Sequence, residues 1–210
     1  MQGSYTAGFQ AELRDLMLWR RDVRRFRRDA VEAAVLDRCL AAFALAPSVG
    51  LSEPWRVIRV ESPEARAAAL KNFEAANAAA LAGYAGDKAR LYAGLKLTGM
   101  QEAPVQLAVY CDGATAKGSG LGAATMPETR AYSVVGAITL FWLAARAVGL
   151  GLGWVSILDP MQLSLDLVVP DSWTFIGYLC VGWPETSDTV PDLERAGWES
   201  REPELKVERR

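Results

Sequence analysis

The sequence of 210 residues contains no histidine. Catalysis by Ser-His-Asp or Cys-His groups is therefore excluded, and so are zinc sites built on histidine. The sequence also has no HExxH, EF-hand or Walker motif. If the protein is an enzyme, we expect a bound cofactor to supply the difficult chemistry, and we predict no metal site.

Cysteine and long apolar runs are scarce too. Cys39, Cys111 and Cys180 are far apart, form no disulfide framework or CxxC motif, and indicate a reducing compartment. The N-terminus lacks the basic and apolar regions of a signal peptide. The most apolar stretch, residues 131–145, is shorter than the roughly 20 residues of a membrane span, and we interpret it as a buried helix. These features predict a cytoplasmic protein that does not bind a membrane.

Neither sign of charge dominates, with 23 Lys and Arg against 25 Asp and Glu. A protein that binds nucleic acid is usually basic overall, so we do not expect nucleic acid as a partner. Positive charge is nevertheless concentrated in one segment, "WRRDVRRF" at residues 19–26, which Arg27 and Arg28 follow directly. Residues 20–28 thus hold six arginines in nine positions, with the carboxylate of Asp22 among them.

Two interpretations of this arginine-rich segment remain open. It is either a solvated connection between helices, as charge runs usually are, or a phosphate-binding site. In the second case guanidinium groups and an adjacent helix end would donate to the phosphate oxygens. We expect the guanidiniums to depress the pKa of Asp22. Asp22 is then an ion-pair partner or a carboxylate that takes a proton from a bound ligand.

The hydrophobic patterns predict one α+β domain spanning residues 1–210, with an extended tail over about 185–210. We expect four or five strands in one sheet on long helices, with loops at 46–54 and 113–127. The tail crosses to a partner or folds back over the surface. Asp29 is predicted to cap the second helix. The expected helices are 8–19, a second one after Asp29, 63–81, 87–103, 128–148 and a short one from Pro160, and the expected strands are 55–62, 105–112, 151–158 and 173–184.

Glycines at residues 149–154, "GLGLGW", resemble a dinucleotide-binding loop, but they follow a helix and precede a strand. This is the reverse of the dinucleotide-binding order, so we interpret Gly149 as a helix C-cap. Ser156 falls in the predicted strand that follows. Its hydroxyl either bonds to backbone in the core or faces a cofactor ring.

Several segments together resemble the FMN-dependent nitroreductase-like superfamily, in the right order from about residue 9 to residue 201. "RRDVRRF" is similar to its RRSxRxF signature, "APSVGLSEPWRV" to its APSxxNxQPWxF loop, and "GLGLGWVS" and "GYLCVGWPE" to its GLGxxW and xGxP segments. Within that superfamily, Asp22 in place of Ser, together with "GLGWVSILDP" and the "GWESR" ending, resembles the BluB-type 5,6-dimethylbenzimidazole synthases.

This resemblance implies a mostly antiparallel sheet and an intertwined homodimer with FMN at the interface. It implies that reduced FMN is consumed as a substrate together with O2. The products would be 5,6-dimethylbenzimidazole, the lower ligand of vitamin B12, and a four-carbon sugar phosphate. A separate flavin reductase is a further possible partner.

The resemblance also implies roles for particular residues. Asp22 would lie near the ribityl C1′ as a base or a positioning group, and Ser156 would face the reacting edge of the flavin. The lid would be residues 113–127 or 84–100. The implied cofactor-binding residues are Arg20, Arg21, Val23 and Arg24, the pocket residues Ser48, Gly50, Leu51 and Ser52, and, from the tail, Arg201 or else Arg195.

Two positions depart from the superfamily pattern. Glu53 stands where Gln is common, and Leu51 is nearest to the usual Asn that contacts the flavin ring. The second change makes reversible hydride transfer from NAD(P)H less expected. Two alternatives stay open: an NAD(P)H-dependent nitroreductase or flavin reductase, and a non-catalytic flavin-binding module in which Asp22 is only an ion-pair partner.

Overall fold

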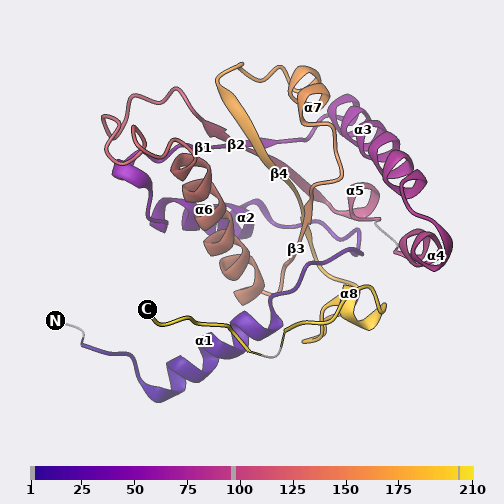
Figure 1. The fold of residues 1–210 in the computed structure, drawn as a ribbon, viewed down its shortest axis with the longest axis horizontal. Coiled ribbons are helices and arrows are strands. Elements are labelled where there is room, and N and C mark those ends of the chain that lie inside the picture. Colours follow the sequence, from indigo (N-terminus) through magenta and orange to yellow (C-terminus); the bar gives the residue numbers. More distant parts are fainter. Residues whose placement is uncertain (1–2, 96–97, 203) are drawn as a thin grey trace.

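A four-stranded antiparallel sheet is the centre of the computed structural model, which describes residues 3–95, 98–202 and 204–210 (Figure 1). The strand order is β1-β2-β4-β3, and every neighbouring pair is antiparallel. The predicted α+β class and the predicted number of strands are confirmed. The strands are β1 Trp55–Arg59, β2 Val105–Asp112, β3 Gly151–Val155 and β4 Trp173–Gly182.

Both faces of the sheet are covered, and the pattern of β2 shows why. Leu107 and Val109 point into one hydrophobic cluster, whereas Ala108 and Tyr110 belong to the other. Successive side chains of a strand point to opposite faces, so a strand buried on both sides reads as a continuous apolar run. The predicted strand at 105–112 matches β2 residue for residue.

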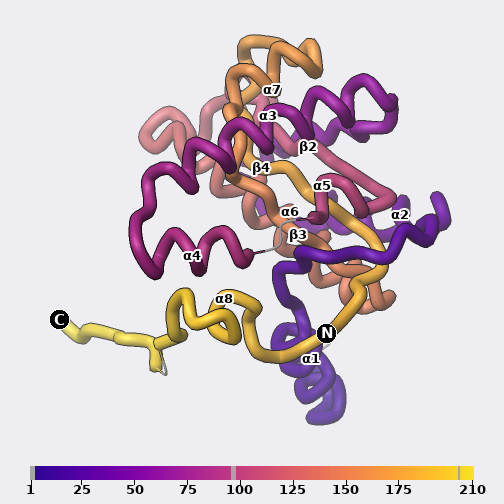
Figure 2. Tube along the Cα trace, turned by 90° about the vertical axis from the view of Figure 1, so that its right-hand side faces the viewer, coloured from indigo at the N-terminus to yellow at the C-terminus, as the bar shows by residue number. Residues whose placement is uncertain are grey.

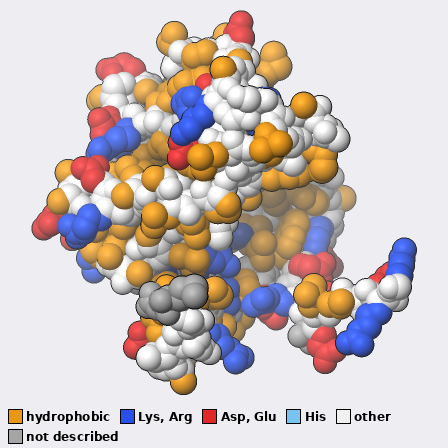
Figure 3. Space-filling view, turned by 90° about the vertical axis from the view of Figure 1, so that its left-hand side faces the viewer, with side chains coloured by type: hydrophobic (Ala, Val, Ile, Leu, Met, Phe, Trp, Pro, Cys, Tyr) orange, Lys and Arg blue, Asp and Glu red, His pale blue; other side chains and the backbone are white. Residues whose placement is uncertain are grey.

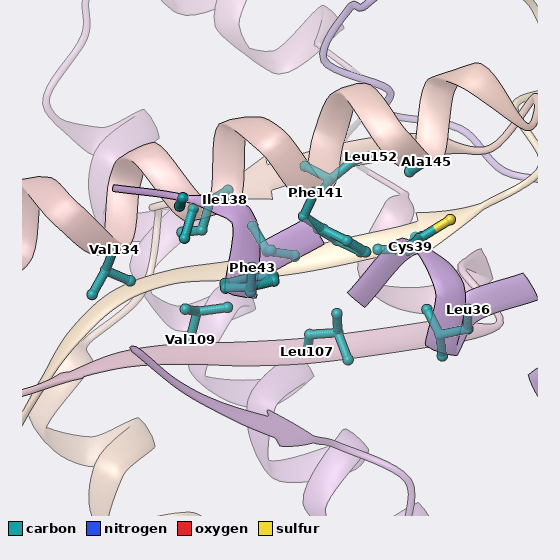
Figure 4. Close-up of a cluster of buried hydrophobic side chains, with 14 of the residues drawn as sticks. Leu36, Cys39, Phe43, Leu107, Val109, Val134, Ile138, Phe141, Ala145 and Leu152 are labelled. Atoms are coloured by element: carbon teal, nitrogen blue, oxygen red, sulfur yellow. The ribbon is translucent and has the colours of Figure 1, made fainter. Parts of the chain in front are cut away.

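The first face packs against α6 (Thr129–Ala147), α2 (Ala33–Leu40) and the 3-10 helix η1 (Ala41–Leu45). In Figure 4, Ile138 and Phe141 of α6 point toward the side chains of the strands and of Phe43. The Phe43 and Phe141 ring centroids are 5.6 Å apart. The interpretation of residues 131–145 as a buried helix is confirmed.

The predicted C-cap of α6 at Gly149 is confirmed as well, because Gly149 has φ 86° and Leu150 N–H donates to the Ala145 carbonyl at 2.9 Å.

The second face packs against α3, α5 and α7, and this layer leads to the candidate site. Ser62 caps α3 through the N–H of Ala65, and Pro63 occupies its first turn, as predicted. Asp159 caps α7 in the same way, by accepting from two backbone N–H groups. The bounds are α3 Pro63–Ala82, α4 Gly86–Gly94, α5 Gly99–Glu102 and α7 Pro160–Asp166.

Four sequence predictions need correction. Asp29 does not cap α2: it pairs with Arg27, and α2 begins only at Ala33. The Arg27 N–H donates to Trp183 O, which keeps this segment extended. The predicted helix at 87–103 is two helices, α4 and α5, and its residues 96 and 97 lie outside the described part of the chain. The predicted strands at both edges of the sheet are too long: the one at 151–158 ends at Val155, where its pairing with β4 stops, and the one at 55–62 ends at Arg59, where its pairing with β2 stops.

Apolar side chains remain exposed on α1 (Ala7–Trp19), none of whose residues is buried. Others lie on the loop that contains η2 (Val49–Leu51), on the loop at 113–127 and on α6. Figure 3 shows hydrophobic side chains across the side of the molecule where these elements lie in Figure 1. Among the described helices, none is long and apolar enough to cross a membrane.

The arginine-rich segment lies along the free edge of β3, where Val23 N–H donates to Leu152 O at 3.0 Å. Two glycines of β3 make this approach possible. A Cβ at Gly151 would lie 2.7 Å from a methyl group of Val23, and one at Gly153 would lie 2.2 Å from the Val23 carbonyl oxygen. The glycines of "GLGLGW" therefore serve close backbone packing rather than nucleotide binding.

We expect Gly153→Ala to destabilise the protein by about 1–3 kcal/mol or more, because the new Cβ would clash with backbone that has to shift. Gly94→Ala is the control, since a Cβ there meets no atom within 4 Å. That variant should be neutral or slightly stabilising. Urea unfolding of both variants measures the difference, and equal midpoints would contradict the close packing.

Candidate functional site

A cleft lies where the arginine-rich segment, the end of β3, the layer of α3 to α5 and the tail meet. Its cavity volume is about 250 Å³, close to the lower end of the usual range of ligand pockets, and it opens to solvent on one side. Its lining is mostly apolar, with the carboxylate of Asp22 and the hydroxyl of Ser156 among the few polar groups. The apolar lining includes Phe73, Tyr92, Met100, Trp154 and Trp198.

Asp22 is held by the edge of the sheet. Its Oδ1 accepts from the Trp154 N–H at 2.8 Å, and its Oδ2 lies 3.6 Å from Arg24 Nε. The expected depression of its pKa is wrong: burial by the surrounding protein raises the pKa, and outweighs the Trp154 N–H and the Arg24 charge. The cleft still exposes 43% of the side chain. Asp22 therefore combines access to a ligand with a raised pKa, which suits a carboxyl that exchanges a proton.

Arg24 has an unsatisfied donor beside this carboxylate. Its side chain is 13% exposed, and Nε has no hydrogen-bond partner within the described part of the chain. A buried donor without a partner is costly, so an oxygen atom of a ligand in the cleft would relieve the cost.

A second recess, about 540 Å³ including its open part, adjoins the cleft at Asp22. Its guanidiniums come from three parts of the chain, namely the arginine-rich segment, α6 and the tail. The carboxylates of Asp22, Asp188 and Asp192 also line the recess, and Arg195 pairs with the last two. The arginines still outnumber them, and because arginine matches the geometry of phosphate oxygens, the recess suits an anionic group. The arginines that line it are Arg21, Arg24, Arg25, Arg146 and Arg195.

Other predicted phosphate ligands lie near this recess. Arg20 stacks over Trp142, with 4.7 Å from its Cζ to the ring centroid. Arg21 Nε donates to Thr189 O at 2.7 Å, and burial together with the charge of Arg201 lowers the pKa of Arg21. Arg201 is therefore close to Arg21, although Arg195 is the tail arginine that lines the recess.

Ser156 lies one residue beyond the end of β3 and is exposed, not in the strand or in the core as one interpretation had it. It lines the same cleft as Asp22 and Val23. The structure thus brings together two candidates that are more than a hundred residues apart in the sequence.

Four predicted pocket residues do not reach this cleft within one chain. These residues precede β1, whereas Asp22 lies beside β3, the strand at the opposite edge of the sheet (Figure 1). The four residues are Ser48, Gly50, Leu51 and Ser52. The loop that carries them packs against the loop at 113–127: a Cβ at Gly118 would lie 2.5 Å from Gly50 O. Leu51 is 69% exposed with φ 56°.

Tyr92 of α4, which belongs to the lid segment that the sequence analysis offered at 84–100, lines the cleft, whereas sequence reasoning missed Trp198 of the tail. Trp198 N–H donates to Leu193 O at 2.8 Å, and its ring packs edge-on against Tyr84 at 5.5 Å. Lys88 Nζ lies 4.1 Å from the Trp198 ring centroid. Figure 2 shows the tail and α8 (Asp192–Arg195) beside α4. The tail therefore folds back as far as Trp198, as one of the two expectations had it, whereas the described residues after Trp198 are exposed and extend away from the body of the molecule (Figure 2). The aperiodic sequence of the tail has no pattern that reveals the contact.

Cys180 also lines the cleft, and it is an inert thiol. Burial raises its pKa to about 12, with a smaller contribution from the negative charge of Asp22. Since only the thiolate is a strong nucleophile or metal ligand, Cys180 contributes packing at neutral pH. Cys39 and Cys111 are buried as well.

Residues 17–183 match the sequence model of the nitroreductase family. The chain belongs to this family. The matched range contains both Asp22 and Ser156 and ends at Trp183, before the tail that covers the cleft. The tail from residue 184 on lies outside the matched range.

Two curated relatives are named 5,6-dimethylbenzimidazole synthase. The protein of Rhodospirillum rubrum is 52% identical over 205 residues, which cover 98% of this chain and 97% of the relative. The protein of Rhodobacter capsulatus is 52% identical over 191 residues, 91% of this chain and 92% of the relative. Among solved structures, an iodotyrosine deiodinase bound to FMN and 3-iodo-L-tyrosine has a TM-score of 0.72 at 21% identity, covering 94% of this chain and 97% of its own. The deiodinase shows the shared fold alone.

The raised pKa of Asp22 predicts a pH dependence of stability. Between the ordinary carboxyl pKa and the raised one, the folded state binds more protons than the unfolded state, so the charged carboxyl costs stability as the pH rises. Asp22→Asn keeps an oxygen for the Trp154 N–H and removes this cost. We expect its stability relative to the parent to increase from about pH 3 to about pH 7.

Asp188→Asn is the control of opposite sign. The backbone N–H of Val190 lowers the pKa of Asp188, so its carboxylate contributes stability that is lost as the pH falls. The stability of this variant relative to the parent should therefore decrease toward neutral pH. Urea unfolding without added flavin measures both trends, and parallel trends in the two variants would refute the assignment to Asp22.

Proposed function

We propose that this protein is a 5,6-dimethylbenzimidazole synthase. It fragments reduced FMN with O2 and forms 5,6-dimethylbenzimidazole and a four-carbon sugar phosphate. The identity of about half of all residues to named synthases, over nearly the whole of both chains, carries this proposal. The meeting of Asp22 and Ser156 in one cleft supports it.

The residues present fit FMN. The apolar cleft suits a flavin ring, and the recess lined by arginines suits its phosphate. Arg20, Arg21 and Arg24 would hold the phosphate and the ring edge. Nε of Arg24 faces Asp22 at 3.6 Å and forms no hydrogen bond within the described part of the chain, so it could donate to a ligand oxygen. Arg201 or Arg195 would complete the phosphate site from the tail.

Reduced FMN would supply both the electrons and the carbon skeleton, so the protein has to bind, orient and protect it. Asp22 would take or hold a proton at the ribityl C1′, a task for which its raised pKa is suited. Ser156 would place a hydroxyl at the reacting edge of the ring. Tyr92, Met100 and Trp198 would exclude water, with the described residues of the segment at 84–100, which are 84–95 and 98–100, as the lid.

A homodimer would complete the site. Ser48, Gly50, Leu51 and Ser52 lie at the far edge of the sheet from Asp22, so a second copy would have to supply them to the cleft. The exposed apolar side chains of α1, α6 and the two loops would then be buried, as in obligate dimers. The supply of FMNH2 requires a reductase, which we propose is a separate protein.

One incubation tests the reaction. The protein is mixed with chemically reduced FMN in air, and mass spectrometry measures 5,6-dimethylbenzimidazole. We expect Asp22→Asn and Ser156→Gly to retain FMN binding and to lose product by about 10²-fold or more. Gln162→Ala is the control and should keep the parent rate, because the exposed side chain of Gln162 bonds Asp166 on the surface of α7 and does not line the cleft.

Product at the parent rate from both variants would overturn the assigned roles. Sustained oxidation of NAD(P)H with a nitroaromatic, leaving the flavin intact, would indicate a nitroreductase or flavin reductase instead. Tight flavin binding without either reaction would indicate a non-catalytic module.

Subunit mixing tests the shared site. We expect Asp22→Asn and Leu51→Asp each to be inactive as pure proteins. In a random mixture half of the dimers are mixed, and each mixed dimer has one intact site, so about a quarter of the parent activity should return. The control is Asp22→Asn mixed with Ser156→Gly, because both changes lie in the same half of the site. Absence of recovery in the first mixture would contradict the shared site.

A further inference from the structure

The position of Ser156 is not set by the sheet. The last paired residue of β3 is Val155, which lies opposite Tyr178. The chain then leaves β3 and reaches α7 at Pro160. Ser156 is exposed at the cleft in this turn, so another contact has to hold the backbone that carries its hydroxyl.

Asn72 of α3 provides that contact. Its Nδ2 donates to the Asp159 carbonyl oxygen at 2.9 Å, and its Oδ1 accepts from the Asp159 N–H at 2.8 Å. One side-chain amide thus satisfies both backbone groups of a single residue, which requires a donor and an acceptor on the same side chain. Asn72 is only 8% exposed, so these bonds are shielded from competing water.

Asp159 is held from its other side as well. Its carboxylate accepts from the N–H groups of Met161 and Gln162 and so caps α7. Between the fixed points Val155 and Asp159, Ile157 and Leu158 pack against the second hydrophobic cluster. Ser156 is therefore the exposed member of a short turn that is anchored at both ends.

The same helix also builds the cleft. Phe73, the residue after Asn72, lines the cleft with Ser156. A movement of α3 would hence shift the wall of the cleft and the turn together, and the amide of Asn72 is the polar link between them.

We propose that Asn72 is a positioning residue for Ser156. Its two hydrogen bonds fix the turn at 156–159 and thereby the direction of the Ser156 hydroxyl into the cleft. The proposal rests on the proposed function, in which Ser156 acts on reduced FMN. Asn72 itself does not line the cleft, so its effect on the reaction has to pass through Ser156.

A double-mutant cycle tests this dependence. Asn72→Ala should lower the rate of 5,6-dimethylbenzimidazole formation by about 10-fold or more, because small displacements of reacting groups are costly. The Kd for FMN should change by less than about 3-fold. In the Ser156→Ala background the same substitution should change the residual rate by less than about 2-fold. Gln162→Ala is the control in both backgrounds.

Equal losses in the two backgrounds would show a general structural role and would overturn the proposal. If Asn72→Ala does not fold, Asn72→Gln carries the same cycle, since it keeps the donor and the acceptor but displaces both by one methylene group. An equal effect of that variant in both backgrounds would overturn the proposal in the same way.

The two hydrogen bonds between Asn72 and Asp159, here called the clamp, can be tested separately. Hydrogen exchange is measured on the protein without flavin, by mass spectrometry of the peptide over 156–163. Asn72→Ala should speed exchange at the Asp159 amide by about 10-fold or more, and Gln162→Ala should leave it unchanged. Unchanged exchange in Asn72→Ala would overturn the clamp. A parent protein that makes no 5,6-dimethylbenzimidazole would refute the proposed function, and the exchange result would then decide the clamp alone.

Discussion

Two hydrogen bonds between the arginine-rich segment and β3 are the interaction on which the candidate site depends. Val23 N–H donates to Leu152 O, and the Trp154 N–H donates to Asp22. They form because Gly151 and Gly153 have no side chain to hold the segment away. The backbone of the segment thereby runs beside β3 like an additional strand, and the side chains of Asp22 and Arg24 line the same cleft.

The electrostatics of the cleft follow from this placement. A carboxylate among arginines would ordinarily have a lowered pKa, but desolvation by the walls of the cleft raises the pKa of Asp22, although 43% of its side chain remains exposed. Arg24 meanwhile keeps an unpartnered buried donor next to it. A site with a carboxyl of raised pKa and an unused guanidinium donor carries an energetic cost without a ligand, and such costs are typical of functional sites.

The polar groups of the cleft are held by backbone hydrogen bonds that originate far away in the sequence. Trp154 orients Asp22, and Asn72 holds the turn that carries Ser156. The fold alone does not determine the chemistry, because the FMN-bound deiodinase has the same architecture around a different substrate. Two features favour the synthase, namely the named relatives over nearly the full chain and the particular residues in the cleft.

The sequence by itself determined the elements whose signals are local. The apolar run of β2, the buried helix α6, the Ser62 and Pro63 start of α3 and the Gly149 cap all depend on neighbouring residues, and each was predictable. The family motifs likewise identified Asp22 and Ser156 as candidates for the site.

Only the tertiary structure decided what depends on distant contacts. Asp29 does not cap α2, because the Arg27 N–H donates to Trp183 O and keeps the segment extended. Ser156 lies beyond β3, because the pairing of β3 with β4 ends at Val155. The pKa of Asp22 depends on desolvation by walls from several elements, and Trp198 reaches the cleft through a tail without periodicity. Long-range packing and burial are properties of the folded chain, so no local pattern encodes them.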